Sequence, residues 1–248
     1  KGDAPYEPSN VSVYKVHIIH RGGTLDLTQN FYSLVITESL FENSITCRLE
    51  FVDTTEKMAE LDPDGTETLR VTFNSEKNRE IDHLFNIYRT DITPDQESGS
   101  KGKGYQVFGI SAEFMTQSTM DINRTMNGNI KNMVNIVFNE VKRNTQVQRA
   151  PNAFRKTKKR LVDSHETKGN VYLNIPGMTP FETIDMLQRR AYNDEFTSSI
   201  FLFYEDFRGY NFCNLEQLIA EGRDEPIEYS YKPAGQVSDG KTASGQFD

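Results

Sequence analysis

Residues 177–222 read GMTPFETIDMLQRRAYNDEFTSSIFLFYEDFRGYNFCNLEQLIAEG, and this stretch carries the clearest fold information in the chain. Thr179 and Glu182 have the spacing of a capping box, with Pro180 at the first helical position. A helix is therefore predicted to begin here. The residues that would form its apolar stripe are Phe181, Ile184, Leu187 and Ala191.

An aromatic hairpin, SSIFLFYEDFRGYNFC, is expected after this helix, with its turn near residues 206–209. Asn214 and Gln217 then open a short second helix, which Gly222 is expected to close. Phe201 and Phe203 share one strand face, which favours packing in a core over an exposed carbohydrate platform. This α+β unit contains no recognisable catalytic constellation, so it favours a structural protein over an enzyme.

The composition of the chain limits the number of domains and the kinds of partner that can be expected. The 248 residues suffice for one large domain or two small ones, and 16 Phe and 11 Tyr compensate for an apolar share of only 36%. A net charge of −8 argues against bulk binding to nucleic acid or anionic membranes. Cys47 and Cys213 are too far apart in sequence for a metal knuckle. No apolar run approaches the roughly 20 residues of a membrane span, so no membrane anchor is expected.

The pattern from residue 11 to about 112 is that of β-strands separated by turn residues. Six short strands within about a hundred residues predict a small antiparallel barrel or sandwich. The six runs are VSVYKVHIIH from Val11, YSLVITESL from Tyr32, ITCRLEFVD from Ile45, TLRVTF from Thr68, HLFNIYRTDI from His83 and YQVFGISAEF from Tyr105.

Residues 129–141 have helical periodicity, with Asn129 as the expected cap. Residues 142–160 follow with eight basic and no acidic side chains, which leaves 20 basic against 36 acidic ones elsewhere. This basic run is either a solvated inter-domain loop or a surface that docks on an acidic partner or passing nucleic acid. With the loop at 93–104, it supplies the candidate partner-contact residues Lys101, Lys103, Arg155, Lys156, Lys158, Lys159 and Arg160.

Candidate chemistry is sparse, and no catalytic, cofactor-binding or metal-ligating residues are predicted. His165 and Glu166 begin a zincin-like motif, but Gly169 occupies the position of its second histidine. Asp62, Asp64 and Glu67 suit a β-turn better than a calcium loop, because position 12 of that loop would be Phe73. His17 and His20 lie three apart in one strand and should point to opposite faces.

The expected fold is α+β, an N-terminal antiparallel β-barrel followed by a small α+β domain. Residues 1–10 form an arm, 11–120 the barrel domain and 121–232 the α+β domain, which includes a strand in EPIEYSYK. Residues 233–248 are expected to be a flexible tail, or a linker to a missing second barrel.

This order of elements resembles the central baseplate hub protein of contractile-tailed bacteriophages, and more distantly the hubs of other contractile injection systems. The resemblance spans roughly residues 11–231 and rests on element order and loose motifs. The segments that carry it are ESLFENSITCRLEFVDTTEKM, YQVFGISAEF, GNIKNMVNIVFNEV, IPGMTPFETIDMLQRRA and FLFYEDFRGYNFCNLEQL.

The resemblance implies that the N-terminal barrel is of the tail-tube type. It also implies a virion structural protein of the tail baseplate, assembled in the host cytoplasm and lacking enzymatic activity. It implies a homotrimer that links the tail tube or its initiators to the central spike, with the tape measure protein in the lumen and DNA present only in transit. Hub proteins carry a second barrel that does not appear in this sequence. The alternatives are a tail-tip cell-wall hydrolase and a carbohydrate- or receptor-binding module.

Overall fold

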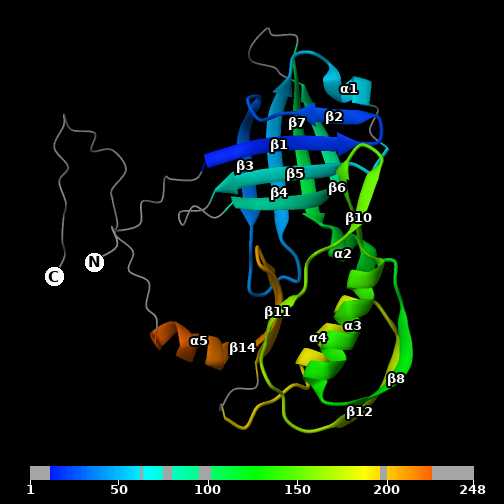
Figure 1. Ribbon diagram of the computed structural model, residues 1–248, viewed down its shortest axis with the longest axis vertical. Coiled ribbons are helices and arrows are strands. Elements are labelled where there is room, and N and C mark those ends of the chain that lie inside the picture. Colours follow the sequence, from blue (N-terminus) through cyan, green and yellow to red (C-terminus); the bar gives the residue numbers. More distant parts are fainter. Residues whose placement is uncertain (1–11, 62–63, 75–79, 95–101, 196–199, 225–248) are drawn as a thin grey trace, which may run out of the picture.

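The computed structural model describes residues 12–61, 64–74, 80–94, 102–195 and 200–224. They form two packed parts, named here the sheet body (residues 12–111) and the helical body (residues 112–224) (Figure 1). The arm at 1–10, the strand expected at 225–232, the tail at 233–248 and the middle of the 93–104 loop lie outside the described residues. No described helix is long and apolar enough to cross a membrane.

One seven-stranded antiparallel sheet makes up most of the sheet body, in the order β2-β1-β5-β6-β7-β4-β3. Alternating side chains point inward, and Val16, Leu49, Phe51, Leu69 and Val107 form its buried centre. The helix α1 (Lys57–Leu61) was not predicted. The strands are β1 (Ser12–His20), β2 (Gly23–Asp26), β3 (Phe31–Thr37), β4 (Thr46–Asp53), β5 (Thr68–Asn74), β6 (Glu80–Pro94) and β7 (Lys103–Ser111).

The α+β class is confirmed, but the closed barrel is wrong, because the sheet is a curled half-barrel with β2 and β3 as separate edges. To close this sheet into a barrel, its two edge strands, β2 and β3, would have to pair along their length, and β2 has only four residues. The helical body occupies part of the opening instead. Its residue Phe207 contacts Phe73 and His83 edge-on, with ring centroids 5.4 and 5.6 Å apart.

Four helices and three small sheets build the described part of the helical body (Figure 1). The sheets are β10-β9, β12-β8 and β11-β14-β13, and α3 lies against α4. The elements are α2 (Ala112–Gln117), β8 (Ile122–Gly128), α3 (Ile130–Asn144), β9 (Gln146–Ala150), β10 (Ala153–Lys156), β11 (Leu161–Ser164), β12 (Val171–Met178), α4 (Pro180–Gln188), β13 (Phe201–Asp206), β14 (Gly209–Asn214) and α5 (Leu215–Asp224).

The locally encoded predictions are confirmed. Thr179 and Glu182 form the capping box of α4 with both hydrogen bonds present, and the Asn129 side chain accepts from the backbone N–H of Lys131 at the start of α3. The hairpin turns between β13 and β14 as expected. Its aromatic rings are core: Phe203 stacks on Tyr210, with centroids 5.4 Å apart, and both contact Phe138 of α3.

Four local predictions are corrected. Helix α5 continues past Gly222 to Asp224. The end of YQVFGISAEF is the start of α2 rather than strand, because β7 ends at Ser111, which is the N-cap residue of α2. The basic run at 142–160 is not an unstructured loop: it contains the end of α3 and the hairpin of β9 and β10. The short strands β2, β8 and β11 were not predicted.

We predict that Gly209→Ala destabilises the protein by about 3 kcal/mol. Gly209 has a φ of +147°, and a β-carbon there would lie 2.6 Å from the carbonyl oxygen of Arg160. Urea denaturation measures the loss. Gly222→Ala is the control, since its β-carbon would meet nothing within 4 Å and helix α5 should gain up to about 1 kcal/mol. Equal stabilities of the two variants would contradict this role for Gly209.

Candidate functional site

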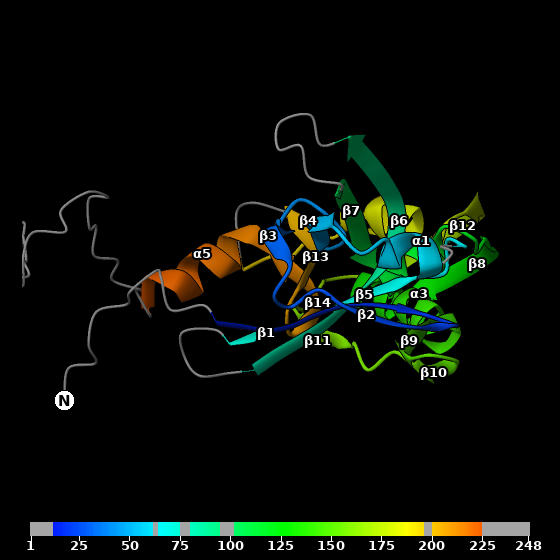
Figure 2. The same ribbon diagram turned by 90° about the horizontal axis from the view of Figure 1, so that it is seen from above.

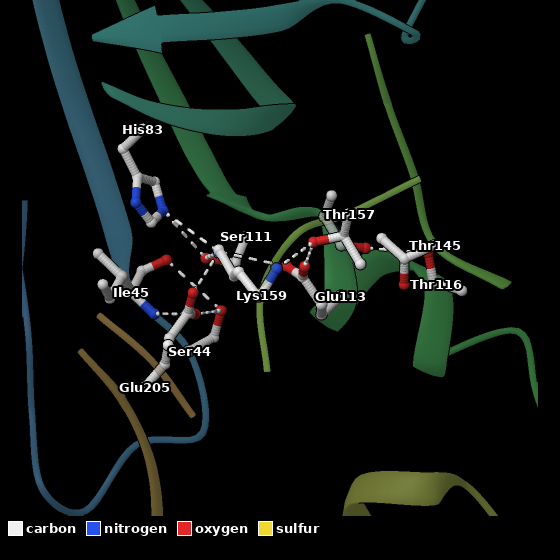
Figure 3. Close-up of polar contacts among 12 residues, drawn as sticks. Ser44, Ile45, His83, Ser111, Glu113, Thr116, Thr145, Thr157, Lys159 and Glu205 are labelled. Carbon is white, nitrogen blue, oxygen red and sulfur yellow. Dashed lines mark hydrogen bonds and ion pairs between the residues drawn. The ribbon is translucent and has the colours of Figure 1, made fainter. Parts of the chain in front are cut away.

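Lys159 lies on the connector between β10 and β11, and its ammonium group turns inward to a cluster of polar side chains (Figure 3). Its Nζ donates to Ser111 Oγ at 3.0 Å and lies 3.2 Å from Glu113 Oε2. It also forms a close ion pair with Glu205. Both carboxylates are buried, so one cation faces two anions away from solvent.

The cluster joins segments that are far apart in the sequence. Ser111 ends β7 of the sheet body, Glu113 lies in the first turn of α2, and Glu205 belongs to β13. Glu205 also accepts hydrogen bonds from the backbone N–H of Ile45 at 3.0 Å and the hydroxyl of Ser44 at 3.3 Å. Lys159, Ser111, Glu113 and Glu205, named here the Lys159 cluster, therefore connect the sheet body to the helical body.

The electrostatics of the cluster depend on burial. Burial disfavours a charged Lys159, but Glu113 and Glu205 outweigh it and raise the pKa of the amine. Burial also raises the pKa of Glu205, against the effect of Lys159. His83 is fully buried 3.3 Å from Lys159 Nζ, and burial together with that positive charge lowers its pKa well below its ordinary value. His83 is thus neutral and accepts at Nε2.

Ser111 and Lys159 have the hydrogen bond of a serine–lysine nucleophile pair. In such a pair the amine acts as a base, which needs a lowered pKa. Here two carboxylates raise the pKa of Lys159, so the amine keeps its proton. The chemistry of the cluster therefore suits holding the two bodies together rather than activating Ser111.

Two further side-chain groups suggest metal ligands: His20 with Asp64 and Glu67, and His165 with Asp163 and Cys213. The His20 group was missed because His20 and the turn at residues 64–67 come together only through the pairing of β1 with β5. The turn predicted at residues 62–65 lies partly outside the described residues, and next to it Glu67 accepts from the backbone N–H groups of Asp64 and Gly65. His17 and His20 do not converge, since His17 lies beside Asp26.

In both groups the hydrogen bond at Nδ1 makes Nε2 of the histidine a hydrogen-bond donor. His20 Nδ1 accepts from the backbone N–H of Gly22, and His165 Nδ1 accepts from that of Asn214. A neutral imidazole then carries its proton on Nε2, which leaves no lone pair there for a metal. Burial also raises the pKa of the Cys213 thiol to about 12. Neither group fits a metal ion as arranged.

The remaining candidate contact residues are distributed over two places. Lys103 is exposed at the start of β7, and Lys101 lies outside the described residues. Arg155, Lys158 and Arg160 are exposed on and after β10. Lys156 is also exposed and donates to the carbonyl of Arg143 at the end of α3. Contact of these residues with a partner stays a prediction, whereas the Lys159 ammonium points into the protein.

Among the residues that the structure describes, the outer edge of β3 is the longest sheet edge without a partner strand in the sheet body. Its sequence, FYSLVIT, has no charged residue, no proline and no glycine. Tyr32 is 66% exposed on it, and Phe41 is 76% exposed in the loop that follows. A cavity of about 330 Å³ adjoins this loop, lined by Leu40, Phe41, Phe114, Asp185 and Arg189 among others.

No family model and no curated protein matches the sequence. Among solved structures, the chain is similar to the 43 kDa tail protein of prophage MuSo2 from Shewanella oneidensis, with a TM-score of 0.49 and 14% identity over 81% of this chain and 54% of that one. It is also similar to a tail protein from Neisseria meningitidis, with a TM-score of 0.41 and 7% identity over 82% and 51%. The chain spans about half the length of each.

We predict that Lys159→Met lowers the free energy of unfolding by about 3–5 kcal/mol, because it leaves two buried carboxylates without their cation. Chemical denaturation at pH 7 provides the measurement. Lys158→Met, at the exposed neighbouring position, is the matched control and should change stability by less than about 0.5 kcal/mol. Similar small losses in both variants would show that the cluster does not stabilise the fold.

A second prediction concerns pH. The folded-state pKa of His83 is lowered, so the unfolded chain takes up the proton first and stability is lost as pH falls below about 6.5. The raised pKa of Glu205 acts in the opposite direction. The His83→Phe variant should therefore lose less stability than the parent between pH 7.5 and 5.5, by up to about 1.4 kcal/mol per pH unit below 6.5. Parallel stability curves of the two proteins would refute this assignment.

Proposed function

We propose that this chain is a structural subunit of a phage tail and, more specifically, a subunit of the baseplate hub on the tail axis. The order of its elements supports the proposal, with an antiparallel sheet body followed by a capped helix and an aromatic hairpin. The two similar solved structures are both of tail proteins, which agrees with it. The observation that carries it is the open edge of β3.

An uncharged strand with an unpaired edge exposes backbone donors and acceptors to any other strand, and monomeric proteins usually protect such edges with charges or proline. β3 has neither over its seven residues. Tyr32 on β3 adds an exposed aromatic ring to this strand, and Phe41 adds another in the loop that follows it. These features are those of an assembly surface, in which a neighbouring subunit adds a strand to the sheet.

The proposal assigns no catalytic role. A cell-wall hydrolase would need two carboxylates facing an open cleft, whereas the buried carboxylates of Glu113 and Glu205 face Lys159. A carbohydrate platform on the β13–β14 hairpin would need exposed rings, but Phe201, Phe203 and Tyr210 are buried. Both rival functions are therefore less well supported than assembly.

For the hub itself, the proposed partners are copies of this chain in a homotrimer around the axis, the tail tube or its initiators, and the central spike. The tape measure protein would end in the lumen, and DNA would meet the ring only in transit. The virion tail baseplate is the proposed location. These finer assignments come from the resemblance of the sequence to hub proteins.

We predict that Ser33→Lys combined with Val35→Lys abolishes self-association, because the added charges oppose strand pairing at the β3 edge. Sedimentation velocity at micromolar concentration gives the oligomeric state. Asn123→Lys with Asn127→Lys adds the same charge to an exposed face of β8 and should leave assembly unchanged. A parent protein that remains monomeric, alone and with tail tube and spike proteins, would refute the proposed function.

A further inference from the structure

Helix α5 projects from the subunit. Its first turn is anchored, because Leu215 and Leu218 pack against buried side chains of the β13–β14 hairpin. Residues 219–223, which form most of the rest of the helix, are all exposed. Figures 1 and 2 both show α5 extending away from the sheet body, with its C-terminal end farthest out. The chain therefore reaches Asp224 at a point remote from its own sheet body.

The residues after this projecting helix have the sequence pattern of one β-strand. Residues 225–232, EPIEYSYK, lie outside the described residues. Pro226 and Pro233 bound the run, and proline is tolerated at the ends of a strand. A strand with one apolar face needs a sheet edge for its backbone and a core for its side chains. The alternating apolar positions are Ile227, Tyr229 and Tyr231.

The edge of β3 fits such a strand in length and in side-chain pattern. β3 has seven residues, and the run between the two prolines, 227–232, has six. Leu34 and Ile36 pack on the core side of the sheet but are only partly buried, and no described strand lies beyond them. An added strand would cover both side chains with its apolar face and would place its polar face on the side of the exposed Val35.

The other edge of the seven-stranded sheet fits less well. β2 has only four residues, so it offers a shorter edge than the six-residue run needs. Its one core residue, Leu25, is already buried, so an added strand would cover little further apolar area there. Between the two edges, β3 is the better acceptor.

We propose that residues 226–232 of one copy pair with β3 of a neighbouring copy, so that subunits are joined by exchange of this strand. This inference rests on the self-assembly proposed above and identifies the strand that fills the β3 edge. The projecting helix favours a neighbouring copy over the chain's own β3, because it carries the following residues away from its own sheet body. Main-chain hydrogen bonds would supply affinity, and the alternating side chains would set the register. Each copy both donates and accepts a strand, so the exchange can continue around a closed ring.

The first test removes the ability of the strand to pair. Glu228→Pro with Tyr229→Pro removes two successive backbone N–H groups, one of which would face β3 in any register. Sedimentation velocity of the full chain at micromolar concentration should show self-association at least about tenfold weaker than in the parent. Gln236→Pro with Val237→Pro lies beyond the predicted strand, and this matched control should associate like the parent.

A second test distinguishes exchange between copies from pairing within one chain. A Val35→Cys protein is mixed in turn with Glu228→Cys, Ser230→Cys and Lys232→Cys proteins, whose changes all lie on the polar face of the predicted strand. A short bismaleimide then links thiols that lie close together. At least one mixture should give a cross-linked dimer on a denaturing gel, and no single variant should do so alone. The two native cysteines are buried, and the parent treated in the same way controls for their reaction.

Three results would overturn the proposal: a double-proline variant that associates like the parent, no cross-linked dimer in any mixture, or a cross-link that forms only within a chain carrying both cysteines. The proposed function has a separate outcome. If the lysine variants of β3 are monomeric but the double-proline variant still associates, β3 remains the assembly edge and only the strand assigned to it is wrong. A parent that is monomeric alone and with tail tube and spike proteins contradicts both.

Discussion

The ion cluster around Lys159 is the constraint on which the arrangement of this protein depends. A largely buried cation and two buried carboxylates are stable only when all of them are in place together, because each alone would lose hydration without compensation. The partners come from β7, α2, β13 and the connector after β10. Forming the cluster therefore fixes how the sheet body meets the helical body.

This junction also explains why the sheet remains open. The helical body places the turn of its β13–β14 hairpin against the sheet, where Phe207 contacts Phe73 and His83. Its backbone N–H also donates to Glu38 at 2.8 Å, just after β3. Apolar area that strand closure would bury is thus partly covered from outside. Within the described residues the outer edge of β3 has no partner strand, and this is the edge on which the proposed assembly rests.

The basic run at residues 142–160 supplies one charge inside the subunit and several charges at its surface. One of its lysines is used inside to join the two bodies, while its neighbours on either side remain at the surface. Lys158 and Arg160 flank Lys159 in sequence, yet only Lys159 reaches the carboxylates. The same segment thus joins the two bodies through one residue and keeps the charges of its neighbours at the surface.

The sequence by itself determined the features that depend on a few adjacent residues. The capping box of Thr179 and Glu182, the Asn129 cap and the turn between β13 and β14 could be predicted because their hydrogen bonds join residues two or three positions apart. Strand alternation likewise indicated the main strands and the α+β class. The absence of a recognisable catalytic motif was also visible at this level.

Only the tertiary structure decided which basic side chain turns inward, that the sheet stays a half-barrel, and that β11 pairs in parallel with β14. Lys159 looks like its neighbours in the sequence, because the carboxylates that hold it lie 46 positions before and after it. The open edge of β3 depends on the length of β2 and on the placement of Phe207. Contacts between distant segments leave no local pattern, so no reading of neighbouring residues could reveal them.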